Sequence, residues 1–173
     1  PHPQLLQNYP TLASQLISAD RIAQDWKISR EELDKLGWIS QVKATKAQKA
    51  GKFKNEIIPI PTKTKEKGSF IYDYDEVIRT NVGEWDWETA KEKMGKLKTV
   101  PGCKFITAGN ACPINDGAAL MLVTSRKKAE ELGLKPRAKI IAFGEVGAHV
   151  HYMLDGPAYA MDKALKRANM TLN

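Results

Sequence analysis

Residues 104–123 read Lys104-Phe105-Ile106-Thr107-Ala108-Gly109-Asn110-Ala111-Cys112-Pro113-Ile114-Asn115-Asp116-Gly117-Ala118-Ala119-Leu120-Met121-Leu122-Val123. The first four residues have the composition of a strand. A Gly-rich turn follows them, and the turn leads into a continuous apolar run over 118–123. A run of that length without alternation is typical of a strand that is buried on both faces of a sheet.

The residues that follow alternate between helix and strand patterns. We expect a helix over 126–132 that ends at Gly133, a strand over 138–144, and a helix that opens at Gly156-Pro157 with proline in its first turn. This alternation predicts an α/β layer. Because two strands cannot form a stable sheet alone, we expect these strands to belong to larger sheets completed by other polypeptide. In this chain alone, residues 105–165 should then expose an apolar face.

The first hundred residues predict helices and irregular segments. We expect a loop over 1–17, a short helix over 18–26, and a helix that starts at the capping box Ser29-Arg30-Glu31-Glu32 and stops at Gly51. Further expectations are strands over 56–61 and 70–72, an irregular segment over 73–86 and a helix over 87–97. Two packing predictions concern the first helices: a core face formed by Leu33, Leu36 and Ile39, and contact between Trp26 and Trp38.

Composition excludes several classes of protein. The chain has 173 residues, 42% of them hydrophobic and 27% charged, which suits one globular domain with a core. Two cysteines do not make a disulfide framework, and no apolar run approaches the roughly 20 residues of a membrane span. With no signal peptide at the start, we expect a cytoplasmic protein. His149 and His151 lack identifiable partners for a metal site, so none is expected.

The net charge of +7 favours a polyanionic partner. Lysines crowd the stretches 43–54 and 63–67. They fit two alternatives: a solvated helix face followed by a loop, or a surface that attracts nucleic acid, an anionic surface or a phosphorylated ligand such as coenzyme A. A nucleic-acid-binding domain is disfavoured, because no aromatic stacking platform is interleaved with these lysines.

Four stretches, in order, resemble the thiolase family. Residues 107–119 are similar to Thr-Ala-Gly-Asn-Ala-Ser-x-x-Asn-Asp-Gly-Ala-Ala, and residues 28–34 to Ile-Ser-Arg-Glu-Glu-x-Asp. Residues 75–79 are similar to Asp-Glu-x-x-Arg. Met153 with Gly156-Pro157 is similar to Met-Gly-x-Gly-Pro. The resemblance implies an α/β, thiolase-like fold, of which residues 1–102 are the coenzyme A-binding loop domain, 103–135 the end of the N-terminal half and 136–173 the incomplete start of the C-terminal half.

The resemblance also implies an activity. Thiolases reversibly condense acetyl-CoA with an acyl-CoA, or cleave a 3-ketoacyl-CoA, through an acyl group bound to a cysteine that a histidine activates, while a second cysteine moves the proton. In the family the nucleophile precedes this region, and the Asn-Glu-Ala-Phe, Gly-His-Pro and Cys-x-Gly-Gly elements follow it. None of them occurs in this sequence. We therefore expect no catalytic residue in this chain and no activity from it alone.

Four residues match positions that bind coenzyme A in the family. Arg79 matches an arginine beside the nucleotide, Ala108 a residue whose carbonyl faces the pantetheine, Cys112 a serine that contacts the pantetheine, and Met153 a methionine of the acyl channel. Each has an alternative: a solvated arginine, an inert packed thiol or a nucleophile at Cys112, and a core methionine. Trp85 or Trp87 could line an acyl or adenine pocket, and Cys103 suits packing.

The sequence leaves two functions open. The first is part of an acetyl-CoA C-acyltransferase of lipid or fatty acid metabolism, with coenzyme A thioesters as substrates, no separate cofactor, and a parent protein that forms a homodimer or homotetramer. The second is a coenzyme A-binding module without chemistry of its own. Neither the degradative or biosynthetic direction nor the acyl chain length follows from these residues.

Overall fold

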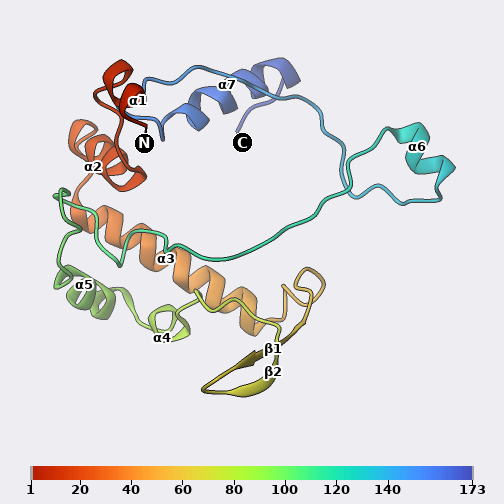
Figure 1. The fold of residues 1–173 in the computed structure, drawn as a ribbon, viewed down its shortest axis with the longest axis horizontal. Coiled ribbons are helices and arrows are strands. Elements are labelled where there is room, and N and C mark those ends of the chain that lie inside the picture. Colours follow the sequence, from red (N-terminus) through yellow and green to blue (C-terminus); the bar gives the residue numbers. More distant parts are fainter. Residues whose placement is uncertain (1, 173) are drawn as a thin grey trace. The chain divides into compact units, whose positions relative to one another are not determined.

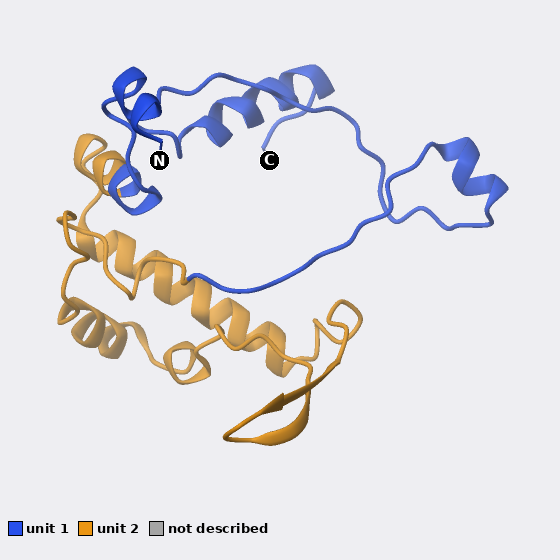
Figure 2. Ribbon diagram, viewed as in Figure 1, with its two compact units in different colours: residues 1–19, 114–173 blue, residues 20–113 orange. Residues whose placement is uncertain are grey.

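The computed structural model describes residues 2–172. Two compact units are formed, one by residues 1–19 and 114–173 and the other by residues 20–113, and we call them unit 1 and unit 2 (Figure 2). The elements, in chain order, are α1 (Pro3–Asn8), α2 (Gln15–Asp25), α3 (Arg30–Lys49), β1 (Ile60–Thr64), β2 (Gly68–Tyr72), α4 (Thr80–Gly83), α5 (Trp87–Gly95), α6 (Arg126–Glu131) and α7 (Gly156–Ala168) (Figure 1).

The long helix α3 organises unit 2. Its predicted capping box is confirmed: the Glu32 amide donates to Ser29 Oγ at 3.2 Å, and the Ser29 amide donates to Glu32 Oε2 at 2.7 Å. These bonds from Ser29 lower the pKa of the Glu32 carboxyl. The predicted stop is also confirmed, because Gly51 adopts a φ of +66° just after the C-cap.

The inner face of α3 differs from the predicted one. Leu36 is 67% exposed, whereas Asp34 and Thr45 are buried, so the predicted Leu33–Leu36–Ile39 core face is wrong at Leu36. Helices α4 and α5 contact α3 (Figure 1). Backbone of the turn at Gly109 approaches this face closely at Gly37, and Asp34 accepts hydrogen bonds from the side chains of Arg30 and Asn110.

The tryptophans tie α3 to α5. The Trp38 and Trp87 ring centroids lie 5.4 Å apart, and Trp38 Nε1 donates to the Trp85 carbonyl at 3.1 Å. Trp26 is 56% exposed, so the predicted packing between Trp26 and Trp38 is wrong. Trp38 lies on the side of α3 that α5 covers, and this pairing is not visible in helical spacing.

The hairpin β1–β2 is antiparallel, with Ile60 opposite Tyr72 and Thr64 opposite Gly68. The predicted strand over 56–61 is displaced: β1 starts at Ile60 and continues to Thr64. The strand at 70–72 is confirmed within β2, and residues 73–86, expected to be irregular, contain the four-residue helix α4. Both strands of a two-stranded sheet are edges, which accommodates Pro61.

In unit 1 the expected loop over 1–17 contains a helix. Pro3 stands in the first turn of α1, where its missing N–H costs nothing, and His2 Nδ1 accepts the Gln4 amide at 3.2 Å. Helices α6 and α7 are confirmed near their predicted positions. Asn169 closes α7 with a φ of +51°. None of the helices in the described range 2–172 has the length and apolarity that crossing a bilayer requires.

The predicted strands over 104–107, 118–123 and 138–144 are not strands in the structure. Thr107 forms an isolated bridge with Thr99, and the other two runs form no ladder among the described residues. Their apolar side chains are exposed, with Leu120 fully accessible and Ile140 71% exposed. A strand without a neighbour leaves its backbone unpaired, so the predicted α/β layer does not form among residues 2–172. The expected exposed apolar face between 105 and 165 is confirmed.

Candidate functional site

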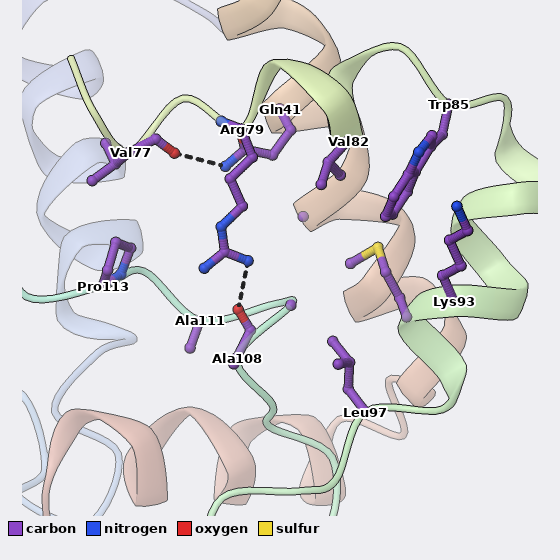
Figure 3. Close-up of a pocket in the computed structure, with 13 residues that line it drawn as sticks. Gln41, Val77, Arg79, Val82, Trp85, Lys93, Leu97, Ala108, Ala111 and Pro113 are labelled. Carbon is purple, nitrogen blue, oxygen red and sulfur yellow. Dashed lines mark hydrogen bonds between the residues drawn. The ribbon is translucent and has the colours of Figure 1, made fainter.

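A cavity of about 240 Å³ lies within unit 2 (Figure 3). Its walls come from α3, from the segment that leads through α4 to Trp85, from α5, and from the turn at 108–113. Arg79 and Lys93 line it together with the apolar side chains of Val77, Val82 and Leu97. The site is therefore an apolar cavity with two cationic side chains.

A polar network fixes the turn that forms one wall. The Asn110 side chain accepts the Thr107 amide at 2.8 Å and donates from Nδ2 to Asp34 Oδ1 at 2.9 Å and to the Phe105 carbonyl at 3.0 Å. Asp34 is buried and also accepts from Arg30 Nε at 2.8 Å. Two of the motifs that the sequence analysis singled out thus meet in one hydrogen-bond network. Removing a partner of the buried Asp34 carboxylate would lower the stability of the fold, because a buried charge without partners is costly.

The start of the same turn is held by Asp20, which sequence reasoning missed. Its Oδ1 accepts the backbone amides of Lys104, Phe105 and Ile106 at 2.9, 2.7 and 3.3 Å. The Gln24 side chain donates to its other oxygen at 2.7 Å. One carboxylate therefore orders three successive peptide groups. The sequence around Asp20 contains no motif that predicts this role.

Glycine allows α3 and the turn to approach each other. A Cβ built on Gly37 would lie 2.8 Å from the Gly109 carbonyl oxygen, and one on Gly109 would lie 2.7 Å from a Leu97 methyl carbon. Both distances are too short for real contacts. The backbone of the turn thus lies directly on the helix at this wall of the cavity.

We expect Gly37→Ala to lower the free energy of unfolding by about 1–3 kcal/mol, because the new methyl group overpacks against backbone that cannot rotate away. Gly95→Ala is the matched control. A Cβ at Gly95 meets nothing within 4 Å at the end of α5, so alanine should be neutral or stabilising there by up to about 1 kcal/mol. Urea denaturation of both variants measures the contrast, and equal effects would contradict the close approach.

Gln41 on α3 places Arg79. Gln41 Oε1 accepts the Arg79 amide at 2.8 Å, and Gln41 Nε2 donates to the Val77 carbonyl at 3.5 Å. The Arg79 guanidinium then reaches the Ala108 carbonyl, with Nη1 at 3.4 Å from the oxygen (Figure 3). The sequence analysis missed Gln41. Its position on a half-buried helix face was the only feature that could have pointed to this role.

The structure brings two of the four predicted site residues together, since Arg79 and Ala108 line the same cavity. Cys112 is an exposed thiol between the lining residues Ala111 and Pro113 but does not line the cavity itself. Met153 belongs to unit 1, where it has a φ of +40°. The proposed roles of all four stay predictions.

The structure also shows where the other candidate residues of the sequence analysis lie. Cys103 is buried, and burial, followed by the nearby Asp20 carboxylate, raises the pKa of its thiol, which suits packing rather than reactivity. Trp85 lines the cavity, whereas Trp87 packs on Trp38. Within residues 2–172, no three histidine, cysteine or acidic side chains cluster as metal ligands would.

Lys93 completes the cavity wall. Its ammonium nitrogen lies 4.3 Å from the centroid of the Trp85 ring, a cation–π distance. The described residues that line the cavity include Arg79 and Lys93 but no carboxylate. This arrangement can accept an elongated ligand that carries negative charge and a planar group.

Comparisons with known proteins show which family the chain resembles. Residues 7–127 match the family "Thiolase, N-terminal domain". The chain is 40% identical over 160 residues to a probable acetyl-CoA acyltransferase of Staphylococcus epidermidis and to an acetyl-CoA acetyltransferase of Syntrophomonas wolfei, in each case covering 91% of this chain and 38% of the relative. The crystal structure of the Bacillus anthracis acetyl-CoA acetyltransferase superposes with a TM-score of 0.79 at 31% identity, again over 91% of this chain and 38% of the other.

The likeness extends over nearly the whole of this chain but over little more than a third of its relatives. The superposition shows that the fold is a segment of the thiolase-like fold, although the exposed runs at 118–123 and 138–144 form no sheet here. The family match covers well over half of the residues. The chain therefore belongs to the thiolase family.

Proposed function

We propose that this chain is the central segment of a thiolase-family acyltransferase. The whole enzyme would reversibly condense acetyl-CoA with an acyl-CoA, or cleave a 3-ketoacyl-CoA by thiolysis, through an acyl group carried on a cysteine. Relatives named acetyl-CoA acetyltransferases support this proposal, and the chain spans 38% of their length. The observation that carries it is the cavity in which Arg79 and the Ala108 carbonyl come together.

The contribution of this segment would be to bind and orient coenzyme A. The turn at 108–113 offers backbone carbonyl groups and small side chains along which an extended pantetheine arm can lie. Arg79, held by Gln41, offers a guanidinium to the anionic nucleotide portion. Held in this way, a thioester reacts with groups already in position, which replaces a bimolecular encounter by a local one.

The domain assignment stays part of this proposal. Residues 1–102 would form the loop domain, 103–135 the end of the N-terminal half, and 136–173 the start of the C-terminal half. The exposed apolar side chains at 118–123 and 138–144 support it, because runs of this kind gain free energy only by burial in a sheet. We also propose a cytoplasmic homodimer or homotetramer for the whole enzyme, on the basis of the family resemblance.

A coenzyme A-binding module without catalysis is the second candidate. It is favoured by the thiols of this chain, since Cys103 is buried with a raised pKa and Cys112 lies at the edge of the cavity. Turnover of acetoacetyl-CoA with free coenzyme A by the full-length protein would support the first candidate. Coenzyme A binding without turnover would support the second.

We expect Arg79→Ala in the full-length protein to weaken coenzyme A binding by about 1–2 kcal/mol, because a charge-assisted hydrogen bond is lost. The Kd should rise roughly five- to thirty-fold. Isothermal titration at low salt measures it, and added salt should reduce the difference because ions screen the charge over about 8 Å at physiological strength.

Arg126→Ala is the control for that experiment. Arg126 is an exposed arginine at the start of α6, outside the cavity, and its loss removes the same charge. Its Kd should match that of the unchanged protein. A Kd that Arg79→Ala leaves unchanged at low salt would remove Arg79 from the site.

A further inference from the structure

Arg30 belongs to the segment 28–34 that carries the capping box of α3, and it is not among the residues that line the cavity. Its guanidinium reaches α5 instead. Nη2 donates to the Met94 carbonyl at 2.7 Å and to the Leu97 carbonyl at 3.3 Å. A cation beside the last carbonyl groups of a helix satisfies them and complements the helix dipole. Arg30 therefore holds the C-terminal end of α5.

The same guanidinium also bonds Asp34 on the next turn of α3. Nε of Arg30 donates to Asp34 Oδ2 at 2.8 Å, and the Asp34 side chain is 4% exposed. The other carboxylate oxygen accepts Asn110 Nδ2 at 2.9 Å, and Asn110 holds the turn that forms one wall of the cavity. One planar fork, which donates in two directions, thus joins α5 to the turn through α3.

The parts that Arg30 joins are adjacent parts of the cavity wall. Met94 and Leu97, whose carbonyl groups it binds, line the cavity together with Gly109 of the turn. The contact is close, since a Cβ built on Gly109 would lie 2.7 Å from a Leu97 methyl carbon and 3.2 Å from the Met94 methyl carbon. The distance between the end of α5 and the turn therefore sets the shape of this wall.

We propose that Arg30 is a positioning residue for ligand binding, which fixes the end of α5 against the turn before coenzyme A enters the cavity. A ligand that meets a preformed wall loses little binding free energy to ordering that wall. The inference rests on the proposed function, because it takes coenzyme A as the ligand. It goes further by naming a residue outside the cavity on which the affinity depends.

The test is Arg30→Lys in the full-length protein, measured by isothermal titration with coenzyme A and by thiolysis kinetics. Lysine keeps a cation for Asp34, but its single ammonium group does not reproduce the fork that also reaches α5. The Kd and the KM for coenzyme A should both rise roughly five- to thirty-fold. The kcat should stay within about two-fold, because the lost interaction serves the ground state and the transition state equally.

Two control variants separate positioning from stability. Lys91→Gln removes an exposed ion pair with Glu31, at 2.8 Å, that also joins α5 to α3, and exposed pairs contribute little. Ser125→Ala removes the N-cap of α6 in unit 1, which lowers stability without touching the cavity. Each should leave the Kd for coenzyme A within about two-fold of its original value.

A double variant tests the route through Asp34. Asn110→Ala removes the amide that links Asp34 to the turn. If Arg30 acts through this link, adding Arg30→Lys should change the Kd of the Asn110→Ala protein by no more than about two-fold, because the link is already broken. Two effects that multiply would show independent roles and overturn the proposal.

The other outcomes also decide the matter. An Arg30→Lys variant with an unchanged Kd, or with a lowered kcat alone, overturns the proposal, as does a Ser125→Ala variant that raises the Kd equally. If Arg30→Lys does not fold by thermal melting, Arg30→Met combined with Asp34→Leu removes both charges together and should show the same rise in Kd. Coenzyme A binding without turnover leaves the Kd to decide, and an unchanged protein that does not bind coenzyme A refutes the proposed function as well.

Discussion

Replacing Asp20 by alanine should lower the free energy of unfolding by about 3–5 kcal/mol, because Lys104, Phe105 and Ile106 would lose the acceptor of their amides. Asp20 is 2% exposed, so water cannot easily take its place. A typical domain has only about 5–15 kcal/mol of stability, so the loss would remove a large part of it. Urea denaturation of the full-length protein measures the change.

Two variants sharpen that experiment. Asp20→Asn keeps one acceptor oxygen but no charge, so its loss should be smaller than that of Asp20→Ala. Asp73→Ala removes a carboxylate from an exposed loop and should change the stability by less than about 0.5 kcal/mol. If Asp20→Ala costs no more than Asp73→Ala, then Asp20 does not hold the turn.

The predicted consequence extends to the binding site. The turn that begins at residue 104 continues into Ala108, Ala111 and Pro113, which line the cavity. Asp20 and Asn110 hold its two ends, so a loosened start should also weaken ligand binding, although Asp20 does not line the cavity. If both effects are observed, folding and ligand binding are coupled through this one segment of irregular backbone.

Helix boundaries were readable from the sequence because their causes are local. Ser29 and Glu32 form the capping box within four residues, and Gly51 supplies the left-handed backbone that ends the helix. At Pro3 the prediction of a loop was wrong, because proline is tolerated in the first turn of a helix. Such signals involve neighbours in the chain. They remain valid whether or not the rest of the protein is present.

The strand predictions for the second half of the chain were wrong for the opposite reason. The runs at 118–123 and 138–144 have the composition of buried strands, but a strand exists only with a hydrogen-bonded partner, and the described residues supply none. The apolar pattern therefore reported a requirement for burial and not a structure that this chain can form. The same pattern correctly predicted the exposed apolar face.

The site was only partly predictable. Arg79 and Ala108 were found through motif resemblance, and the structure places them on one cavity. The sequence analysis missed Gln41 and Asp20 because each acts across the fold: Gln41 on backbone 38 residues away and Asp20 on backbone more than 80 residues away. A polar residue on a helix face gives no sign of so distant a partner, and only tertiary structure reveals it.

We expect the isolated 173-residue chain to show no thiolysis or condensation activity, a loss on the order of 10⁶-fold or more relative to the full-length enzyme. The proposed reaction would use a nucleophilic thiolate with a histidine base and a second cysteine for the proton. This sequence contains two cysteines, of which Cys103 is buried with a raised pKa, so its thiolate is disfavoured. Spectrophotometric assay with acetoacetyl-CoA and free coenzyme A tests the chain, with the full-length protein as the positive control. Turnover by the isolated chain that Cys112→Ser abolishes would establish Cys112 as a nucleophile and overturn the assignment of this segment to binding alone.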